Sequence, residues 1–183
     1  MGNAESSSVG LDKPEPLMEE AARNIEMRFY DAAVKKYRRA YELLKEAGSK
    51  ASAARALRLA AETGLQDAVA DYELAAQAFE EVGLLYLDNP LTALSAPQAF
   101  ANAVFCLLAA GRGKTAAAKV EEFGKLEKLK WGDEGIAVAC ILESYNAGHR
   151  NQTKDLALCY CERLGASVKW RDAVFKRIVE RLS

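Results

Sequence analysis

The feature that most constrains the fold of this chain is a stretch that occurs twice. AAVKKYRRAYELLKEAG starts at Ala32 and DAVADYELAAQAFEEVG starts at Asp67, an offset of 35 residues. The pairs that match at this offset are Val34 and Val69, Tyr37 and Tyr72, Ala40 and Ala75, Glu46 and Glu81, and Gly48 and Gly83. Tetratricopeptide units repeat every ~34 residues, and each helical pair buries its apolar side only against the next pair. The repeat therefore predicts an all-α, right-handed solenoid of antiparallel helical hairpins.

The composition favours a helical chain with a substantial core. Hydrophobic residues make up 50% of the 183 residues, and only four prolines interrupt the sequence. Alanine and leucine dominate the interior, and both lose little side-chain freedom in a helix. We expect about nine helices, at 16–28, 31–47, 50–62, 65–86, 95–110, 114–122, 133–147, 151–164 and 168–181.

Local signals predict where some of these helices end. The glycine that closes each copy of the repeat suits a left-handed residue, which would stop a helix there. Further on, Pro90 lacks a backbone donor and biases Asn89 away from the α region, so the chain should break at this point. A new helix can start with Ser95 as its N-cap and Pro97 in its first turn.

Charge and cysteine content exclude several classes of function. The net charge is −1 and the pI is about 6.0, so no overall field would hold nucleic acid or an anionic membrane. The cysteines have no paired CxxC or CxxH spacing, which argues against a zinc site or a disulfide framework. We expect no cofactor and interpret the cysteines as buried thiols of a cytosolic protein: Cys106, Cys140, Cys159 and Cys161.

The N-terminus carries a candidate lipidation signal. No apolar run approaches the ~20 residues of a membrane-spanning helix, and a secretory signal is absent. The opening Met-Gly-Asn-Ala-Glu-Ser matches the myristoylation pattern, with Gly2 as the acylated residue. The alternative is a plain tail; in either case we expect a flexible segment 1–15 before a helical domain at 16–183. One myristoyl chain binds membrane only marginally, so we expect a cytoplasmic protein that attaches peripherally and reversibly to the cytosolic face.

Charge is unevenly distributed along the chain. The segment 35–58 contains eight basic residues against two acidic ones, whereas 59–111 contains seven acidic residues and no base. Six bases have the spacing of one helical face or of neighbouring turns. They are our candidates for binding an acidic partner: Lys35, Lys36, Arg38, Arg39, Arg55 and Arg58. A solvated face that only maintains solubility is the alternative.

The last predicted helix has an apolar stripe. Trp170, Val174, Ile178 and Leu182 recur every four residues, so they lie on one side of a helix. Basic residues surround the stripe: Lys169, Arg171, Lys176, Arg177 and Arg181. We expect at least Trp170 and Val174 to dock onto the preceding hairpin.

An ordered series of motifs runs through the C-terminal part of the chain. It comprises Phe79-Glu80-x-Val82-Gly83, Asn89-Pro90-Leu91, the mid-helix Cys106, Lys119-x-Glu121-Glu122, Ile141-Leu142-Glu143, and finally Trp170, Phe175, Arg177 and Ile178. This series resembles the C-terminal half of the soluble NSF attachment proteins, the SNAP adaptors of membrane fusion. The resemblance covers most of 17–183 and is strongest from Ala68 onward. It implies a short form without several helical pairs and without the apolar loop that contacts membrane in the family.

The resemblance also implies partners. SNAP proteins grip the SNARE four-helix bundle through basic residues, which here would be the six candidates above. Their C-terminal end contacts the NSF ATPase, and the corresponding candidates are Glu143, Arg177 and Leu182. The chain departs from the family where Asn146 and Ala147 replace two acids of the NSF-facing cluster. Losing these carboxylates should weaken recognition of NSF.

An enzymatic function has little support. The sole histidine, His149, follows Ala147-Gly148 at a helix end, where an exposed or capping role is expected. Gly111-Arg112-Gly113-Lys114-Thr115 lacks the spacing and the preceding strand of a phosphate-binding loop, so we interpret it as an interhelical turn. Two hypotheses remain: a short SNAP-like adaptor in vesicle fusion, or a membrane-tethered, tetratricopeptide-like scaffold with no NSF coupling.

Overall fold

The computed structural model describes residues 13–66, 70–165 and 168–182. Within these ranges the chain forms nine α-helices, one short 3-10 turn (Ala93–Ser95) and no strand. The helices are α1 Pro14–Glu26, α2 Tyr30–Glu46, α3 Lys50–Gly64, α4 Tyr72–Leu87, α5 Ala96–Ala109, α6 Gly113–Gly124, α7 Gly132–Asn146, α8 Arg150–Arg163 and α9 Lys169–Glu180. The predicted all-α class and the expected number of helices are confirmed.

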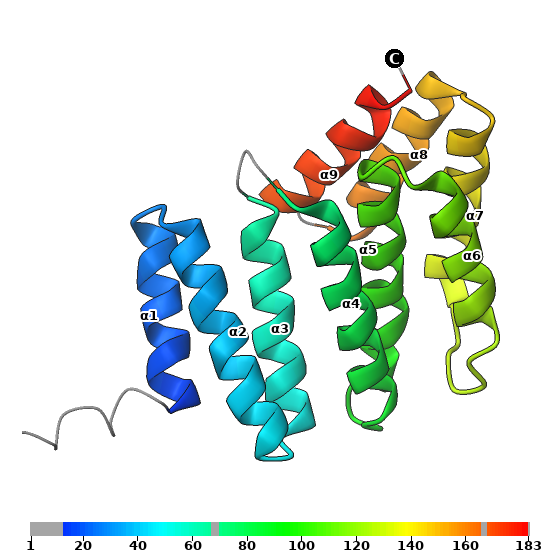
Figure 1. The fold of residues 1–183 in the computed structure, drawn as a ribbon. Coiled ribbons are helices and arrows are strands. Elements are labelled where there is room, and N and C mark those ends of the chain that lie inside the picture. Colours follow the sequence, from blue (N-terminus) through cyan, green and yellow to red (C-terminus); the bar gives the residue numbers. More distant parts are fainter. Residues whose placement is uncertain (1–12, 67–69, 166–167, 183) are drawn as a thin grey trace, which may run out of the picture.

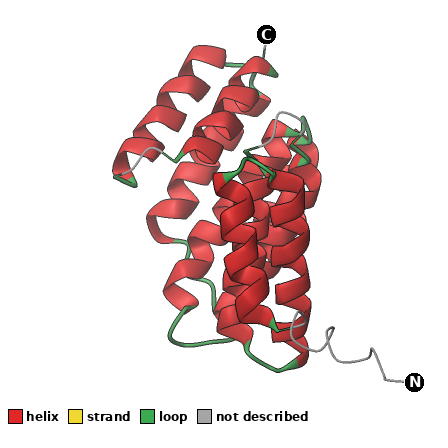
Figure 2. Cartoon of the chain, turned by 90° about the vertical axis from the view of Figure 1, so that its left-hand side faces the viewer, coloured by secondary structure: helices red, strands yellow, loops and turns green. Residues whose placement is uncertain are grey.

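Consecutive helices are antiparallel and stack into a solenoid (Figure 1). Helices α1 to α7 follow one another along the molecule, and each packs against its neighbours in the sequence. The last hairpin, α8 and α9, turns back behind α5 and stands out to one side in Figure 2. Helix α5 therefore contacts α4, α6, α7 and α9 and forms the centre of the structure.

The core is built around the aromatic rings of α5. Phe100 packs on Phe123 of α6 with 4.4 Å between ring centroids, and Phe105 packs on Phe175 of α9 at 4.9 Å. All four rings are buried, and burying one such ring contributes about 1.5–3 kcal/mol. These contacts attach both α6 and α9 to the same helix.

The stripe on α9 docks as expected, but across a wider surface than the preceding hairpin. Trp170, Val174 and Ile178 are buried. Trp170 stacks on Phe79 of α4, with 5.4 Å between ring centroids, and α9 contacts both α5 and α8. The backward turn of the last hairpin explains the difference, because it brings α9 to helices that lie far earlier in the sequence.

The two glycines that close the repeat copies have different roles. Gly48 follows α2 with φ +72°, as predicted for a helix stop. Gly83, in contrast, is buried inside α4, and a Cβ added there would lie 2.8 Å from the ring of Phe100. The prediction of a helix end at Gly83 is wrong, because this glycine allows α4 and α5 to approach closely.

The predicted helix at 65–86 also starts too early. Leu65 is the C-cap of α3, and α4 begins at Tyr72 after Asp71, whose carboxylate accepts a hydrogen bond from the Leu74 amide at 2.9 Å. Such an acidic N-cap satisfies a backbone donor that has no partner within the helix. The break after α4 is where Pro90 predicts it. Ser95 is the N-cap residue of α5, although its side chain makes no capping hydrogen bond.

Candidate functional site

Helix α2 carries four of the six basic candidates, in different environments. Lys35 and Arg39 are exposed to solvent. Lys36 is half-buried and forms an ion pair with Glu20 of α1, and the hydrogen bond from Lys36 lowers the pKa of the Glu20 carboxyl. Lys36 therefore holds α1 against α2 instead of facing an external partner.

Arg38 is half-buried and lines a cleft of about 380 Å³ between α2, α3 and α4. Its Nε is buried and has no hydrogen-bond partner among the described residues. Asp31 and Asp71 line the same cleft. Arg38 thus shares this cleft with two acidic residues instead of lying on a fully exposed face.

Helix α3 carries the other two candidates. Arg55 is exposed. Arg58 is half-buried, and its Nη1 lies 2.7 Å from Oε1 of Glu62, one turn later in the same helix. Arg58 also donates a hydrogen bond to the Tyr86 hydroxyl of α4. Arg58 is therefore engaged within the protein, whereas Arg55 is available to a partner.

Ion pairs between stacked helices account for part of the uneven charge. Lys45 of α2 pairs with Glu81 of α4 at 2.8 Å, and Lys50 of α3 pairs with Asp88 after α4 at 2.9 Å. The hydrogen bond that Lys45 donates to Glu81 raises the pKa of Lys45 above its ordinary value. The same arrangement continues to α6, where the pairs are Arg112 with Glu73 and Lys119 with Glu80, both at 2.7 Å. The basic and acidic segments are thus partly complementary surfaces of neighbouring repeats.

The return of α9 creates a pocket that sequence reasoning missed. Its volume is about 400 Å³, and α3, α4, α5 and the start of α9 line it. Arg58 and Arg171 both line the pocket, together with Trp170 and Asn102. From the sequence, Arg171 is one of the basic residues that surround the apolar stripe of α9, but in the structure its side chain is buried. Helical periodicity does not predict this pocket, because the pocket forms only where α9 packs against earlier helices.

The three candidates for ATPase contact lie on α7, on α9 and just after α9. Glu143 is exposed in the last turn of α7, and Leu182 is half-exposed just after α9. Arg177 of α9 is half-exposed, and its Nη1 lies 3.4 Å from Oε2 of Glu180. The ends of α7 and α9 point the same way in Figure 1. Within the described ranges, no hydrogen bond or ion pair joins the three residues to one another.

The remaining reactive side chains are scattered. Cys106 is buried, which raises its thiol pKa, but Cys140 and Cys159 are exposed on α7 and α8. The prediction of buried thiols is therefore wrong for these two, since they lie on outer helix surfaces. His149 is exposed at the N-cap position of α8. The described part of the chain contains no group of three or more His, Cys, Asp or Glu residues that could hold a metal ion.

Two features bear on membrane attachment. Gly2 lies outside the described residues, so its acylation stays a prediction. In the part of the chain that the structure describes, no helix combines the length and the apolar character required to cross a bilayer.

Comparison with known proteins identifies the family. The family model described as "Soluble NSF attachment protein, SNAP" matches residues 17–160, which include most of α1, all of α2 to α7 and most of α8. A search of curated proteins found no significant match. The helical solenoid described above and this match over most of the chain agree with the resemblance found in the motifs. The chain is a member of the soluble NSF attachment protein family.

Proposed function

We propose that this protein is a SNAP-like adaptor that binds the SNARE helical bundle in vesicle fusion and intracellular protein transport. The observation that carries the proposal is the exposure of Lys35 and Arg55 on the neighbouring helices α2 and α3 of a SNAP-family chain. Exposed bases of this kind would steer and orient an acidic helical partner. Arg39 is exposed on the same helix as Lys35 and belongs to the proposed surface.

The structure narrows the set of residues proposed for this contact. Lys36 and Arg58 already have carboxylate partners within the protein, namely Glu20 and Glu62. Breaking those pairs would cost stability without adding a contact. We therefore assign partner binding to the surface around Lys35 and Arg55, and structural roles to Lys36 and Arg58.

Recruitment of an NSF-type ATPase is the finer part of the proposal. Glu143 is exposed in the last turn of α7 and Leu182 is half-exposed just after α9, so a partner could reach each of them. The neighbouring positions Asn146 and Ala147 add no negative charge to the end of α7. The alternative function, a membrane-tethered scaffold without ATPase coupling, is favoured by this lack of carboxylates.

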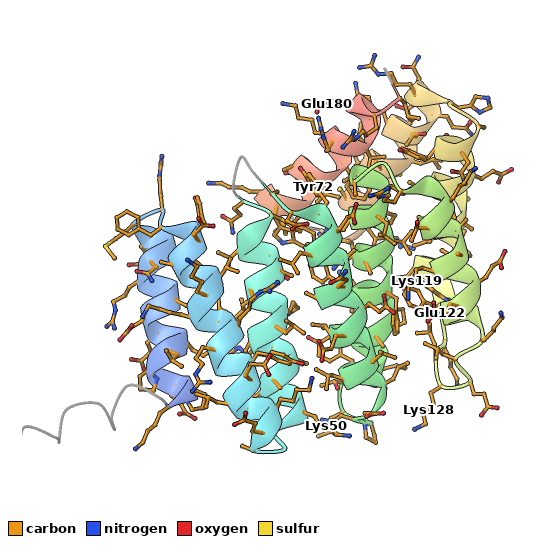
Figure 3. The ribbon with its side chains drawn as sticks, in the orientation of Figure 1. Lys50, Tyr72, Lys119, Glu122, Lys128 and Glu180 are labelled. Atoms are coloured by element: carbon orange, nitrogen blue, oxygen red, sulfur yellow. The ribbon has the colours of Figure 1, made fainter. Side chains whose placement is uncertain are left out.

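Peripheral membrane attachment is also proposed, through an acyl chain on Gly2 and a second contact. Leu91 and Leu94, between α4 and α5, are 92% and 94% exposed. Lys128 extends at the same end of the molecule (Figure 3). Exposed apolar side chains beside bases suit the headgroup region of an anionic bilayer. Such a contact would supply the second signal that a single acyl chain needs.

Charge-reversal variants test the SNARE proposal. Lys35→Glu combined with Arg55→Glu should weaken binding to an assembled SNARE bundle by about tenfold, or ~1.4 kcal/mol. The matched control is Lys114→Glu combined with Lys154→Glu, which reverses two exposed charges on α6 and α8. Equal loss in both double variants would show a general charge effect and refute the assigned surface.

A further inference from the structure

The pocket at the start of α9 contains the only charged side chain that is buried within the described residues. Arg171 is 8% exposed, and its Nε has no hydrogen-bond partner among the described residues. Its guanidinium carbon lies 5.2 Å from the ring centroid of the adjacent Trp170, which also lines the pocket. A guanidinium does not lose its proton in a protein, so a buried arginine needs a compensating anion.

Among the described residues, the pocket holds no unpaired carboxylate that could serve as this anion. Glu62 is the carboxylate that lines it, but Glu62 lies 2.7 Å from Arg58. No ion pair of Arg171 occurs within 4 Å among the residues that the structure describes. The two arginines and one glutamate leave the pocket with an excess of one positive charge.

A second buried polar group in the same pocket also has no partner. The Oδ1 atom of Asn102 is buried and accepts no hydrogen bond within the described ranges, and Asn102 is only 5% exposed. Asn102 belongs to α5, the helix against which α9 packs. The pocket thus combines a cationic donor, Arg171, with a neutral acceptor, Asn102.

We propose that this pocket binds a carboxylate that has an N–H group beside it, as in an acidic residue of a peptide. The carboxylate would accept a charge-assisted hydrogen bond from Arg171, and the adjacent peptide N–H would donate to Oδ1 of Asn102. The volume of about 400 Å³ is sufficient for one such residue. This proposal follows from the pocket alone and does not depend on SNARE binding.

The proposal predicts opposite effects of one substitution on stability and on binding. Replacing a buried charge by an apolar residue of similar volume is often neutral or stabilising. Arg171→Leu should therefore leave the melting temperature unchanged or raise it, while it abolishes ligand binding. Arg150→Leu, at an exposed position on α8, is the control and should leave binding unchanged.

Fluorescence of Trp170 reports on the site, because its ring lines the pocket. The chain has one other tryptophan, Trp131, so the titration uses a Trp131→Phe background. The probe is N-acetyl-aspartate amide at constant ionic strength, and N-acetyl-asparagine amide is the uncharged control. We expect saturable, millimolar binding of the charged probe alone, weakened at least tenfold by Arg171→Leu.

Several results would overturn the proposal. These are the absence of a saturable fluorescence change with the charged probe, equally tight binding of the uncharged control, and equally tight or tighter binding of inorganic phosphate. A large drop in melting temperature for Arg171→Leu would show a purely structural arginine. The thermal midpoint of the chain with its native Trp131 provides an independent check, since it should rise with the charged probe.

Discussion

The close packing of α4 on α5 predicts a specific response to a single added methyl group. In Gly83→Ala the new Cβ would lie 2.8 Å from two ring carbons of Phe100, whereas ordinary contacts between carbon atoms are about 3.5–4.0 Å. Phe100 is fully buried and packs on Phe123 and Trp131, so the ring has little room to move. The two helices must therefore separate locally.

The expected magnitude follows from two opposing effects. Alanine is favoured over glycine inside a helix by about 0.8–1.0 kcal/mol, and overpacking a core costs about 1–3 kcal/mol. The short distance and the fixed ring place Gly83→Ala near the upper end of that cost. We expect a net loss of about 1–2 kcal/mol, which lowers the melting temperature of a chain of this size by about 2–8 °C.

Thermal and urea denaturation measure this change, and Gly124→Ala is the control. Gly124 lies in the last turn of α6, and a Cβ there would have no neighbour within 4 Å, so this variant should be neutral or slightly stabilising. Phe100→Leu should cost less in the Gly83→Ala background than in the original chain, because the smaller side chain relieves the contact. Unchanged or increased stability of Gly83→Ala would refute the packing argument.

Three further predictions concern the surface and the titrating groups. Leu91→Asp combined with Leu94→Asp should reduce binding of non-acylated protein to phosphatidylserine-containing vesicles, measured by flotation; unchanged flotation would contradict the proposed membrane contact. Burial raises the pKa of Tyr160 from 10.0 to about 12, so the folded state retains this proton longer and should lose about 2–3 kcal/mol of stability between these pH values; denaturation at alkaline pH should show a smaller loss for Tyr160→Phe. Iodoacetamide should label exposed Cys140 in the native state and buried Cys106 only after unfolding, as peptide mass spectrometry can determine; equal labelling rates would contradict the assigned burial.

The repeat and the motif order predicted the fold because both depend on local patterns. Apolar residues at helical spacing determine which side of each helix is buried. Pro90 prevents α4 from continuing, and this effect does not depend on which helices α4 packs against. The role of Gly83 could not be predicted in this way. A glycine near the end of a repeat looks like a helix stop until the position of Phe100, on the next helix, is known.

The candidate site was less predictable, because it depends on contacts between distant segments. Six bases in one segment look like a continuous basic face, but whether each is free depends on carboxylates elsewhere, such as Glu20 for Lys36. For Arg171, the sequence gives no sign that the side chain is buried. Its place beside an apolar stripe suggests exposure, yet the return of α9 buries it against α5.

Equilibrium binding of the unmodified chain to an assembled SNARE four-helix bundle tests the central proposal most directly. The proposal predicts saturable binding at low ionic strength that weakens as salt is added, because exposed bases such as Lys35 and Arg55 would supply the contact. No binding at low ionic strength, by a folded chain with the helical content described above, would contradict the assignment as a SNARE adaptor.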